Sequence, residues 1–159
     1  MEKDKLLKLG ELSKLMLNSK DIYEAIHKSA DLVKDLIEVD RVSIFIFENG
    51  HLWTLRADYT EKIEIPDNKG IVGYVAKEKK PYITNDAYND EYFEKSVDLK
   101  TGFTTKNILA VPIVDTVGKL IGVVEFINKK DDFNEKDIVL GKLYAQYVSE
   151  PIKFHLGII

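Results

Sequence analysis

The hydrophobic pattern of this chain has a helical period at both ends and a strand period in the middle. Apolar side chains recur every three or four positions in three segments, which predicts helices over residues 3–17, 20–37 and 134–154. Between them, RVSIFIFENGHLWTLRAD alternates around Asn49-Gly50, a dipeptide typical of two-residue hairpin turns. This alternation predicts two paired strands, near residues 41–47 and 51–58.

Further strand and helix signals follow this hairpin. A third strand over residues 61–65 is expected to end at Pro66, and GIVGYVAK, residues 70–77, is expected to form a short helix. Two strongly β-forming segments, residues 107–114 and 119–128, are joined by a short turn. Because hairpin links join antiparallel strands, the sequence predicts an α/β domain of the α+β kind. Its central antiparallel sheet of about six strands carries the N- and C-terminal helices on one face.

Helix boundaries are marked by capping residues and by one proline. Asn18 or Ser19 is expected to cap the second helix, and Asn134 the last one. Acidic residues in the first turn of the last helix support that start. Pro151 is expected to kink or end the last helix, because proline removes one backbone hydrogen bond.

Composition narrows the class of function. The length of 159 residues suits one domain, and the net charge of −4 argues against a nucleic-acid-binding surface as the main feature. Cysteine is absent, which excludes disulfides, thiol catalysis and thiolate metal sites. The three histidines are far apart in sequence, so no metal site is expected. No apolar run approaches the roughly 20 residues that span a bilayer, and MEKDK is unlike a signal peptide, so a cytoplasmic chain is expected.

One acidic residue breaks the pattern of its strand. In IGVVEFI, Glu125 alternates onto the face of three apolar residues, Ile121, Val123 and Ile127. A carboxylate on a buried face costs several kcal/mol unless it is protonated, paired or hydrogen-bonded. Two interpretations stay open: an acid at a strand end or sheet edge that pairs with a lysine, or an acceptor that faces a ligand.

Two other features could bind a small molecule, and none could carry catalysis. Ser43 is expected on the same strand face as Phe45 and Phe47. The glycine-flanked helix start at Ile71 and Val72 offers free backbone amides to an anion. No P-loop, zinc-protease or serine-hydrolase motif occurs, and no nucleophile is accompanied by a base. We therefore expect no catalytic residues and no enzyme.

Near the last helix the sequence carries the residues of a known signature. Asn128-Lys129, Phe133 and Asp137 match the NKFDE signature of GAF domains, with Ile138 in place of the final glutamate. Over residues 20–150 the chain resembles a GAF domain, the small-molecule sensor module of signalling proteins, and most of all the cyclic-nucleotide-binding GAF domains of phosphodiesterases and adenylyl cyclases. The resemblance implies an ion pair between Lys129 and Asp137 that joins the last strand to the last helix.

The resemblance also implies a ligand pocket on the free face of the sheet. The segment NDAYNDEYFEKSVDLKTGFTTKNIL, residues 85–109, is similar to the lid that covers a bound nucleotide in these domains. Carried over by position, the ligand-binding residues are Ser43, Asp58, Ile71, Val72, Asp98, Thr101, Thr105 and Glu125. The implied ligand is a cyclic purine nucleotide, cGMP or cAMP, with no other cofactor. Ala57 stands where phosphodiesterase domains tend to place a stacking aromatic, for which Trp53, Tyr59 or Phe103 could substitute.

The terminal helices are more apolar than one helix layer needs, which predicts a homodimer. The expected interface residues are Leu6, Leu9, Leu12, Met16, Leu143, Tyr144, Tyr147 and Phe154. The alternative is that these helices pack only on each other within one chain.

The implied organisation is that of a sensor domain with helical ends. It consists of an N-terminal dimerisation helix (1–19), a sensor core (20–133) and a C-terminal helix (134–159) leading to an output domain outside this chain. Sigma-54-dependent, NifA-like transcription activators, sensor kinases and diguanylate cyclases have this layout, and the first is favoured by resemblance. Two alternatives stay open: a GAF domain that only dimerises and relays signals, and a sensor of a different metabolite. A GAF-type methionine sulfoxide reductase would need cysteines.

Overall fold

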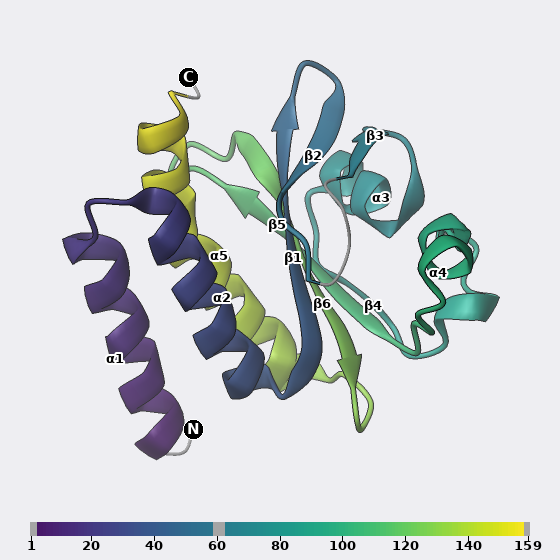
Figure 1. The fold of residues 1–159 in the computed structure, drawn as a ribbon, viewed down its shortest axis with the longest axis horizontal. Coiled ribbons are helices and arrows are strands. Elements are labelled where there is room, and N and C mark those ends of the chain that lie inside the picture. Colours follow the sequence, from purple (N-terminus) through teal and green to yellow (C-terminus); the bar gives the residue numbers. More distant parts are fainter. Residues whose placement is uncertain (1–2, 59–62, 158–159) are drawn as a thin grey trace.

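The computed structural model describes residues 3–58 and 63–157 and shows one twisted sheet with helices on both faces (Figure 1). The strand order is β3-β2-β1-β6-β5-β4, and every neighbouring pair is antiparallel. The strands are β1 (Val39–Glu48), β2 (His51–Arg56), β3 (Glu64–Pro66), β4 (Tyr82–Thr84), β5 (Ile108–Val114) and β6 (Leu120–Lys129). The predicted antiparallel α+β fold is confirmed.

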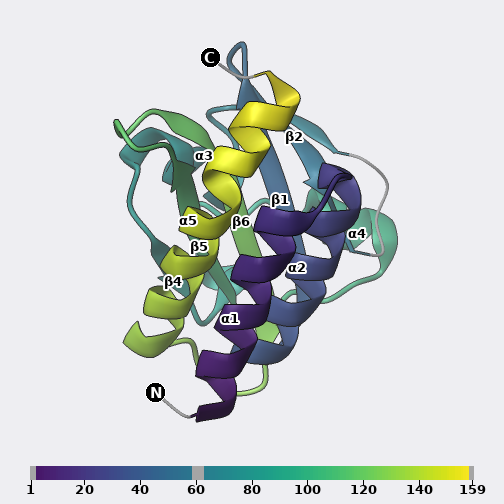
Figure 2. The same cartoon turned by 90° about the vertical axis from the view of Figure 1, so that its left-hand side faces the viewer.

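The helices form two groups, one on each face of the sheet. They are α1 (Lys3–Asn18), α2 (Ile22–Ile37), α3 (Gly70–Glu78), the 3-10 turn η1 (Ala87–Asn89), α4 (Ser96–Thr101) and α5 (Glu135–Leu156). Helices α2 and α5 cover one face, and α1 lies across them on the outside (Figure 2). Helix α3 and the segment with η1 and α4 lie on the opposite face (Figure 1). We call the face that α3, η1 and α4 cover the smaller face of the sheet.

Each face has its own apolar core. The larger core joins the three long helices to the sheet through residues such as Ile26, Val124 and Tyr144, none of which is measurably exposed. The smaller core packs α3 against the other face through Val75 and Val123. Because the sheet separates the two cores, the smaller face can hold polar side chains without disturbing the larger core.

The hairpin signal is confirmed by the backbone. Asn49 and Gly50 have φ angles of 52° and 77°, so both occupy the left-handed region that a type I′ turn requires. The strand after the turn ends at Arg56, two residues before the predicted end. Of the predicted third strand, residues 63–65 lie inside the described chain, where β3 begins at Glu64, and residues 61–62 lie outside it.

One predicted helix boundary is wrong. Asp21, rather than Asn18 or Ser19, caps α2: its carboxylate accepts the backbone N–H groups of Tyr23 (3.0 Å) and Glu24 (3.3 Å). The reason is that α1 continues through Asn18, which leaves that residue inside a helix. The predicted cap at Asn134 is confirmed as a reciprocal capping box with Asp137.

Pro151 does not end the last helix, which runs on to Leu156. Proline lacks the N–H that would bond to the carbonyl one turn earlier. The next residue, Ile152, is fully buried in the larger core. Its burial offsets the missing bond and keeps the last turn helical.

The terminal helices use most of their apolar side chains within one chain. Leu9, Leu12, Met16 and Tyr144 are buried in the larger core, and Leu143 and Tyr147 are half-buried against it. Phe154 is exposed, and the side chain of Leu6 lies outside the described part. The expected interface was wrong in its buried members, because α1 folds back onto α2 and α5. None of the helices in residues 3–58 and 63–157 is long and apolar enough to cross a membrane.

Candidate functional site

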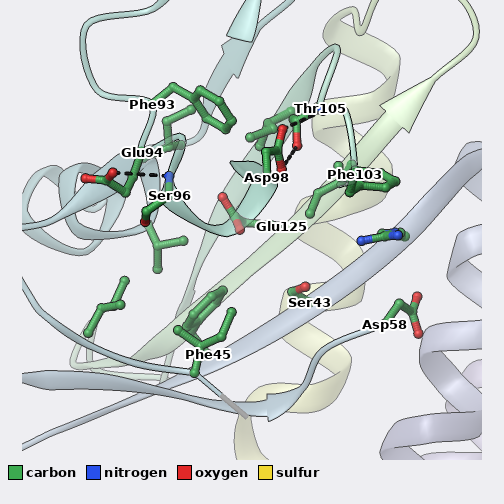
Figure 3. A pocket seen from close by; sticks show the side chains of 18 residues that line it. Ser43, Phe45, Asp58, Phe93, Glu94, Ser96, Asp98, Phe103, Thr105 and Glu125 are labelled. Carbon is green, nitrogen blue, oxygen red and sulfur yellow. Dashed lines mark hydrogen bonds between the residues drawn. The ribbon is translucent and has the colours of Figure 1, made fainter. Parts of the chain in front are cut away.

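A cavity of about 140 Å³ lies between the smaller face of the sheet, the start of α3 and the lid, which we define as residues 85–106 (Figure 3). Seven of the eight predicted ligand-binding residues line it: Ser43, Asp58, Ile71, Val72, Asp98, Thr105 and Glu125. Thr101 is not among the residues that line it. Its hydroxyl accepts the backbone N–H of Phe103 at 3.4 Å in the turn after α4. The fold thus brings together residues that span more than 80 positions of sequence.

Glu125 and Ser43 form a polar pair on the floor of this cavity. Antiparallel pairing of β1 with β6 places Ser43 directly opposite Glu125. Glu125 is only 9% exposed, and no described residue hydrogen-bonds or ion-pairs with its carboxyl group. Burial raises the pKa of Glu125 from 4.5 to about 7. The lysine-paired edge interpretation is wrong, because β6 is an inner strand between β1 and β5 and no described cation meets this acid.

Of the three apolar residues that were predicted to share the strand face of Glu125, one lies on the opposite face. Val123 and Ile127 pack on the cavity side with Glu125, whereas Ile121 lies in the larger core on the helix side. The pairing of β5 with β6 skips Ile121, since Ile113 pairs with Gly122 and Val114 with Leu120. This β-bulge reverses the alternation beyond Gly122.

The first turn of α3 forms one wall of the cavity. Lys69 provides no side-chain cap, and Ile71 and Val72 are almost fully buried against the cavity. The first N–H groups of a helix have no partner within it and carry the positive end of its dipole. Gly73 allows the close approach of the preceding loop, because a Cβ there would lie 2.9 Å from the carbonyl oxygen of Asp67. This wall is suited to a negatively charged group.

Asp98 is bound entirely within the lid. Its Oδ1 accepts the hydroxyl of Thr105 at 2.9 Å, and its Oδ2 accepts the Thr105 N–H and the Tyr88 hydroxyl, both at 2.7 Å (Figure 3 shows the Thr105 contacts). The residue is 6% exposed. In this state Asp98 fastens α4 to the segment that leads into β5.

Replacing Asp98 by asparagine is expected to loosen the lid. An amide cannot accept all three of these hydrogen bonds, and bonds to a charged acceptor stabilise by about 1.5–3 kcal/mol. Amide hydrogen exchange of residues 96–105 should then accelerate by about 10- to 100-fold, with little change in the sheet. Asp86→Asn, which removes an exposed acid of the same segment, is the control. Unchanged exchange in Asp98→Asn would show that other contacts hold the lid.

Asp58 lines the cavity, but its carboxylate oxygens contact other residues of the chain. Oδ1 lies 2.7 Å from an Arg56 guanidinium nitrogen, and Oδ2 accepts the N–H of Val42 at 3.0 Å. Lys34 of α2 lies 3.5 Å from Oδ2. Asp58 therefore ties the end of β2 to β1 and α2 in this state.

Arg41 is a cavity residue that the sequence interpretation missed. It lies on β1 two residues before Ser43, and its guanidinium carbon is 3.3 Å from the ring centre of Phe103 in the lid. The strand alternation of Arg41, Ser43 and Phe45 could have revealed it. Of the proposed stacking residues, Phe103 lines the cavity. Trp53 is not among the lining residues and donates its indole N–H to Glu48 at 3.0 Å, and Tyr59 lies outside the described residues.

The signature residues lie beside the cavity and link the elements that surround it. Lys129 and Asp137 form the implied ion pair at 3.3 Å, and the Lys129 ammonium also donates to the carbonyl of Ile37 at 2.6 Å. Asn128 accepts the N–H of Lys106 at 2.6 Å and donates to the carbonyl of Thr104 at 2.9 Å. Phe133 is buried in the larger core. The signature thus joins β6, the last helix and the end of the lid.

Within the described ranges, no group of three or more His, Asp or Glu side chains could hold a metal ion. The polar groups that line the cavity are instead four carboxyl groups, of which those of Asp58 and Asp98 are bound within the chain, together with hydroxyls, a guanidinium and helix N–H groups. Such a set suits an organic ligand that carries both hydrogen-bond donors and a negative charge.

Known proteins resemble this chain in sequence and in fold. A dual 3′,5′-cyclic-AMP and -GMP phosphodiesterase 11A from Takifugu rubripes is 30% identical over 155 residues, which cover 86% of this chain and 17% of that protein. A cGMP-specific 3′,5′-cyclic phosphodiesterase from Drosophila mojavensis is 33% identical over 168 residues, which cover 92% of this chain and 15% of that protein. The chain therefore spans less than a fifth of the length of these relatives.

The fold matches that of a solved GAF domain. The GAF domain of a phosphoenolpyruvate-protein phosphotransferase from Coxiella burnetii superposes with a TM-score of 0.86 at 16% identity, over 98% of this chain and 97% of that one. The GAF domain family model matches residues 21–150, most of the chain. The chain therefore belongs to the GAF domain family, a family of regulatory domains.

Proposed function

We propose that this GAF domain binds a cyclic purine nucleotide between the sheet and the lid. The observation that carries the proposal is the Glu125 carboxyl, which opens onto the cavity floor at 9% exposure and has no hydrogen-bond or ion-pair partner among the described residues. A buried polar group is stable only when something hydrogen-bonds to it, and here the cavity itself is the space for that partner. The names of the two phosphodiesterase relatives, which refer to cyclic nucleotides, support the choice of ligand class.

The two ends of the cavity suit the two ends of such a ligand. The ring N–H and amino groups of a purine can donate to the Glu125 carboxyl and approach the Ser43 hydroxyl beside it. The negatively charged cyclic phosphate can then reach the first-turn N–H groups of α3 near Ile71 and Val72. This arrangement satisfies the polar floor and the uncapped helix start with one molecule.

Binding would require the lid to move. Ligand pockets usually measure about 300–1,000 Å³, whereas this cavity measures about 140 Å³. Asp98 would also have to exchange some of its contacts with Thr105 and Tyr88 for contacts with the ligand. A ligand acts only through different affinities for two states, and an open and a closed lid would provide these states.

A panel of nucleotides tests the proposal directly. We expect cGMP or cAMP to raise the melting temperature of the wild type and to bind in calorimetry, and Glu125→Ala to weaken that binding by about 10-fold or more, while remaining folded. Glu78→Ala, which removes an exposed acid at the end of α3 that does not line the cavity, is the control. Absence of binding by every cyclic nucleotide at millimolar concentration would contradict the proposal.

A second candidate is a GAF domain that relays signals without a ligand. The carboxylate oxygens of Asp58 and Asp98 are bound within the chain, and the cavity is small, as an unused pocket would be. A further candidate is a sensor in which the same cavity binds another small metabolite. A wild type that binds no nucleotide but has a defined oligomeric state would favour the relay, and a response to a non-nucleotide metabolite would favour the other sensor.

The terminal helices are the proposed route to an output domain, and we propose a homodimer in which they meet. With Leu9, Leu12, Met16 and Tyr144 buried, the exposed apolar side chains that can form the contact include Leu17 and Phe154, each 81% exposed. They lie on the last turns of α1 and α5, which reach the same end of the molecule (Figures 1 and 2). The favoured output, a sigma-54-dependent transcription activator, rests on family resemblance alone.

We expect Leu17→Asp with Phe154→Asp to give a folded monomer in sedimentation while the wild type sediments as a dimer at tens of micromolar. Both side chains are exposed, so charge at these positions should disturb association and leave the fold intact. Leu9→Asp is unsuitable because Leu9 is 7% exposed and belongs to the core. A monomeric wild type at this concentration would exclude the proposed dimer.

A further inference from the structure

We infer that a second pocket, at the edge of the sheet beside β5, binds a small organic acid, that is, one carboxylate on a compact apolar body. This edge pocket has a volume of about 160 Å³ and shares no lining residue with the cavity beneath the lid. Its polar side chains are those of Lys79, Lys142 and Gln146, and no acidic residue of the described chain lines it. The inference concerns a second ligand and does not depend on nucleotide binding.

The edge pocket exists because β4 is shorter than β5, the strand with which it pairs. The pairing reaches only to Ala110, so no described strand lies beside Val111 to Val114 on the side away from β6. The end of α3 borders this edge from the smaller face, and α5 covers the other face (Figure 1). Pro112 lacks the N–H that an added strand would need, and the carbonyl of Val114 already accepts the Ser149 hydroxyl at 2.6 Å. This edge is therefore unsuited to a further strand and open to a small molecule.

The floor of the edge pocket is apolar and sets the size of the ligand. Val111 and Ala145 are 1% and 4% exposed, and Val114 and two prolines, Pro81 and Pro112, line the pocket beside them. A cavity of about 150 Å³ holds one benzene molecule, so this space suits an apolar body of about six carbon atoms. The side chains of aspartate and glutamate are too short to cover such a floor. The carboxylate is therefore expected to come from a free small molecule and not from a partner protein.

The two lysines of the edge pocket have no counter-ion in the described chain. No described residue hydrogen-bonds or ion-pairs with the side chain of Lys79, Lys142 or Gln146. The chain has a net charge of −4, so acids are not scarce, yet none faces this pocket from the described residues. Two ammonium groups at one pocket repel each other, and a carboxylate between them would be attracted to both. The Gln146 amide can donate a hydrogen bond to the same carboxylate.

Methyl NMR of the domain with benzoate and with benzamide tests the inference. The two probes share a ring and have nearly the same shape, and only benzoate carries a charge. We expect benzoate to shift the methyl signals of Val111, Val114 and Ala145 saturably, with a dissociation constant of the order of 1 mM, because exposed ion pairs stabilise little. Benzamide should bind at least about 5-fold more weakly. Added salt should narrow this difference, because it screens the two ammonium groups.

Two lysine variants and one control separate the edge pocket from net charge. Lys79 has a φ of 55° at the C-terminal cap of α3, where glycine is the usual residue, so Lys79→Gly removes the ammonium and suits the backbone. Lys79→Gly and Lys142→Met should each reduce the preference for benzoate, and together they should bring the ratio of the two affinities to about one. Lys136→Met removes an exposed lysine in the first turn of α5 that does not line the edge pocket, and it should leave the ratio unchanged.

Each contrary outcome overturns the inference. Equal affinity for benzoate and benzamide would mean that the edge pocket selects no charge, and the wild type alone decides this even if a variant fails to fold. An equal loss of preference in Lys136→Met and Lys142→Met would mean that net charge attracts the anion. Shifts at Ile71 and Val72 without shifts at the β5 methyl groups would place benzoate in the cavity beneath the lid. A wild type that binds no cyclic nucleotide would contradict the proposed function and leave the edge pocket standing.

Discussion

Between pH 4.5 and pH 8, the free energy of unfolding of Glu125→Gln is expected to rise by about 3 kcal/mol relative to that of the wild type. The substitution should thereby remove most of the pH dependence of unfolding between these two values. Burial raises the pKa of Glu125 from 4.5 to about 7, and each unit corresponds to about 1.4 kcal/mol. The folded state keeps the proton more tightly than the unfolded state. This contribution to stability is therefore complete below pH 4.5 and is lost as the pH rises through 7. Glutamine has nearly the same shape and carries no titrating proton.

Urea unfolding of the wild type and the variant at pH 5, 6, 7 and 8 measures the effect. The wild type should lose stability with rising pH, while Glu125→Gln should change much less over the same range. Glu94→Gln, at an exposed acid of the same cavity, should follow the wild type. Parallel curves for the wild type and Glu125→Gln would mean that the Glu125 carboxyl is not buried and unpaired as described.

Gly122→Ala is expected to cost more than about 4 kcal/mol or to prevent folding. A Cβ at this position of β6 would lie 2.0 Å from the carbonyl oxygen of Phe45 and 3.3 Å from the Cα of Ile46, both on β1. These are backbone atoms of a central strand, so the clash cannot be relieved by turning a side chain. The close approach of β1 and β6 is also what pairs Ser43 with Glu125.

Denaturant unfolding followed by circular dichroism tests this expectation. Gly10→Ala is the matched control, because a Cβ at Gly10 meets nothing within 4 Å and α1 should gain about 0.5–1 kcal/mol from losing an interior glycine. Opposite effects of the same chemical change would separate steric contact from helix propensity. Stability of Gly122→Ala within 1 kcal/mol of the wild type would contradict the described pairing of β1 with β6.

Elements with strong local signals could be predicted from the sequence. The Asn49-Gly50 turn requires two left-handed residues, and few other dipeptides accept that conformation. The Asn134 cap and its capping box likewise depend on neighbours within three residues. Such signals can be interpreted from the sequence because they do not depend on contacts with distant residues.

Elements that depend on distant contacts were missed or misplaced. Strand β4 has three residues and exists because β5 pairs with it across the chain. The bulge that turns Ile121 toward the helices arises because Ile121 is an extra residue of β6 between the pairs Ile113–Gly122 and Val114–Leu120. Apolar residues of the terminal helices look the same in sequence whether they face their own chain or a second copy.

The sequence predicted which residues line the site better than it predicted the contacts that these residues make. Strand alternation places Ser43 and Glu125 toward the cavity, since a period of two fixes the face. Alternation says nothing about partners, so the engagement of Asp98 with Thr105 and of Asp58 with Arg56 could not be foreseen. Arg41 was passed over because its partner, Phe103, lies 62 residues away in the lid.

Amide hydrogen exchange of the lid, with and without cGMP or cAMP, tests the central claim most directly. The ligand-free domain should exchange fastest in residues 85–106, which hold only short helical turns. Saturating nucleotide should then protect residues 96–105 and the first turn of α3, with little change in α1 and α5. Identical exchange with and without nucleotide, under conditions where calorimetry shows binding, would mean that the ligand does not occupy the space beneath the lid.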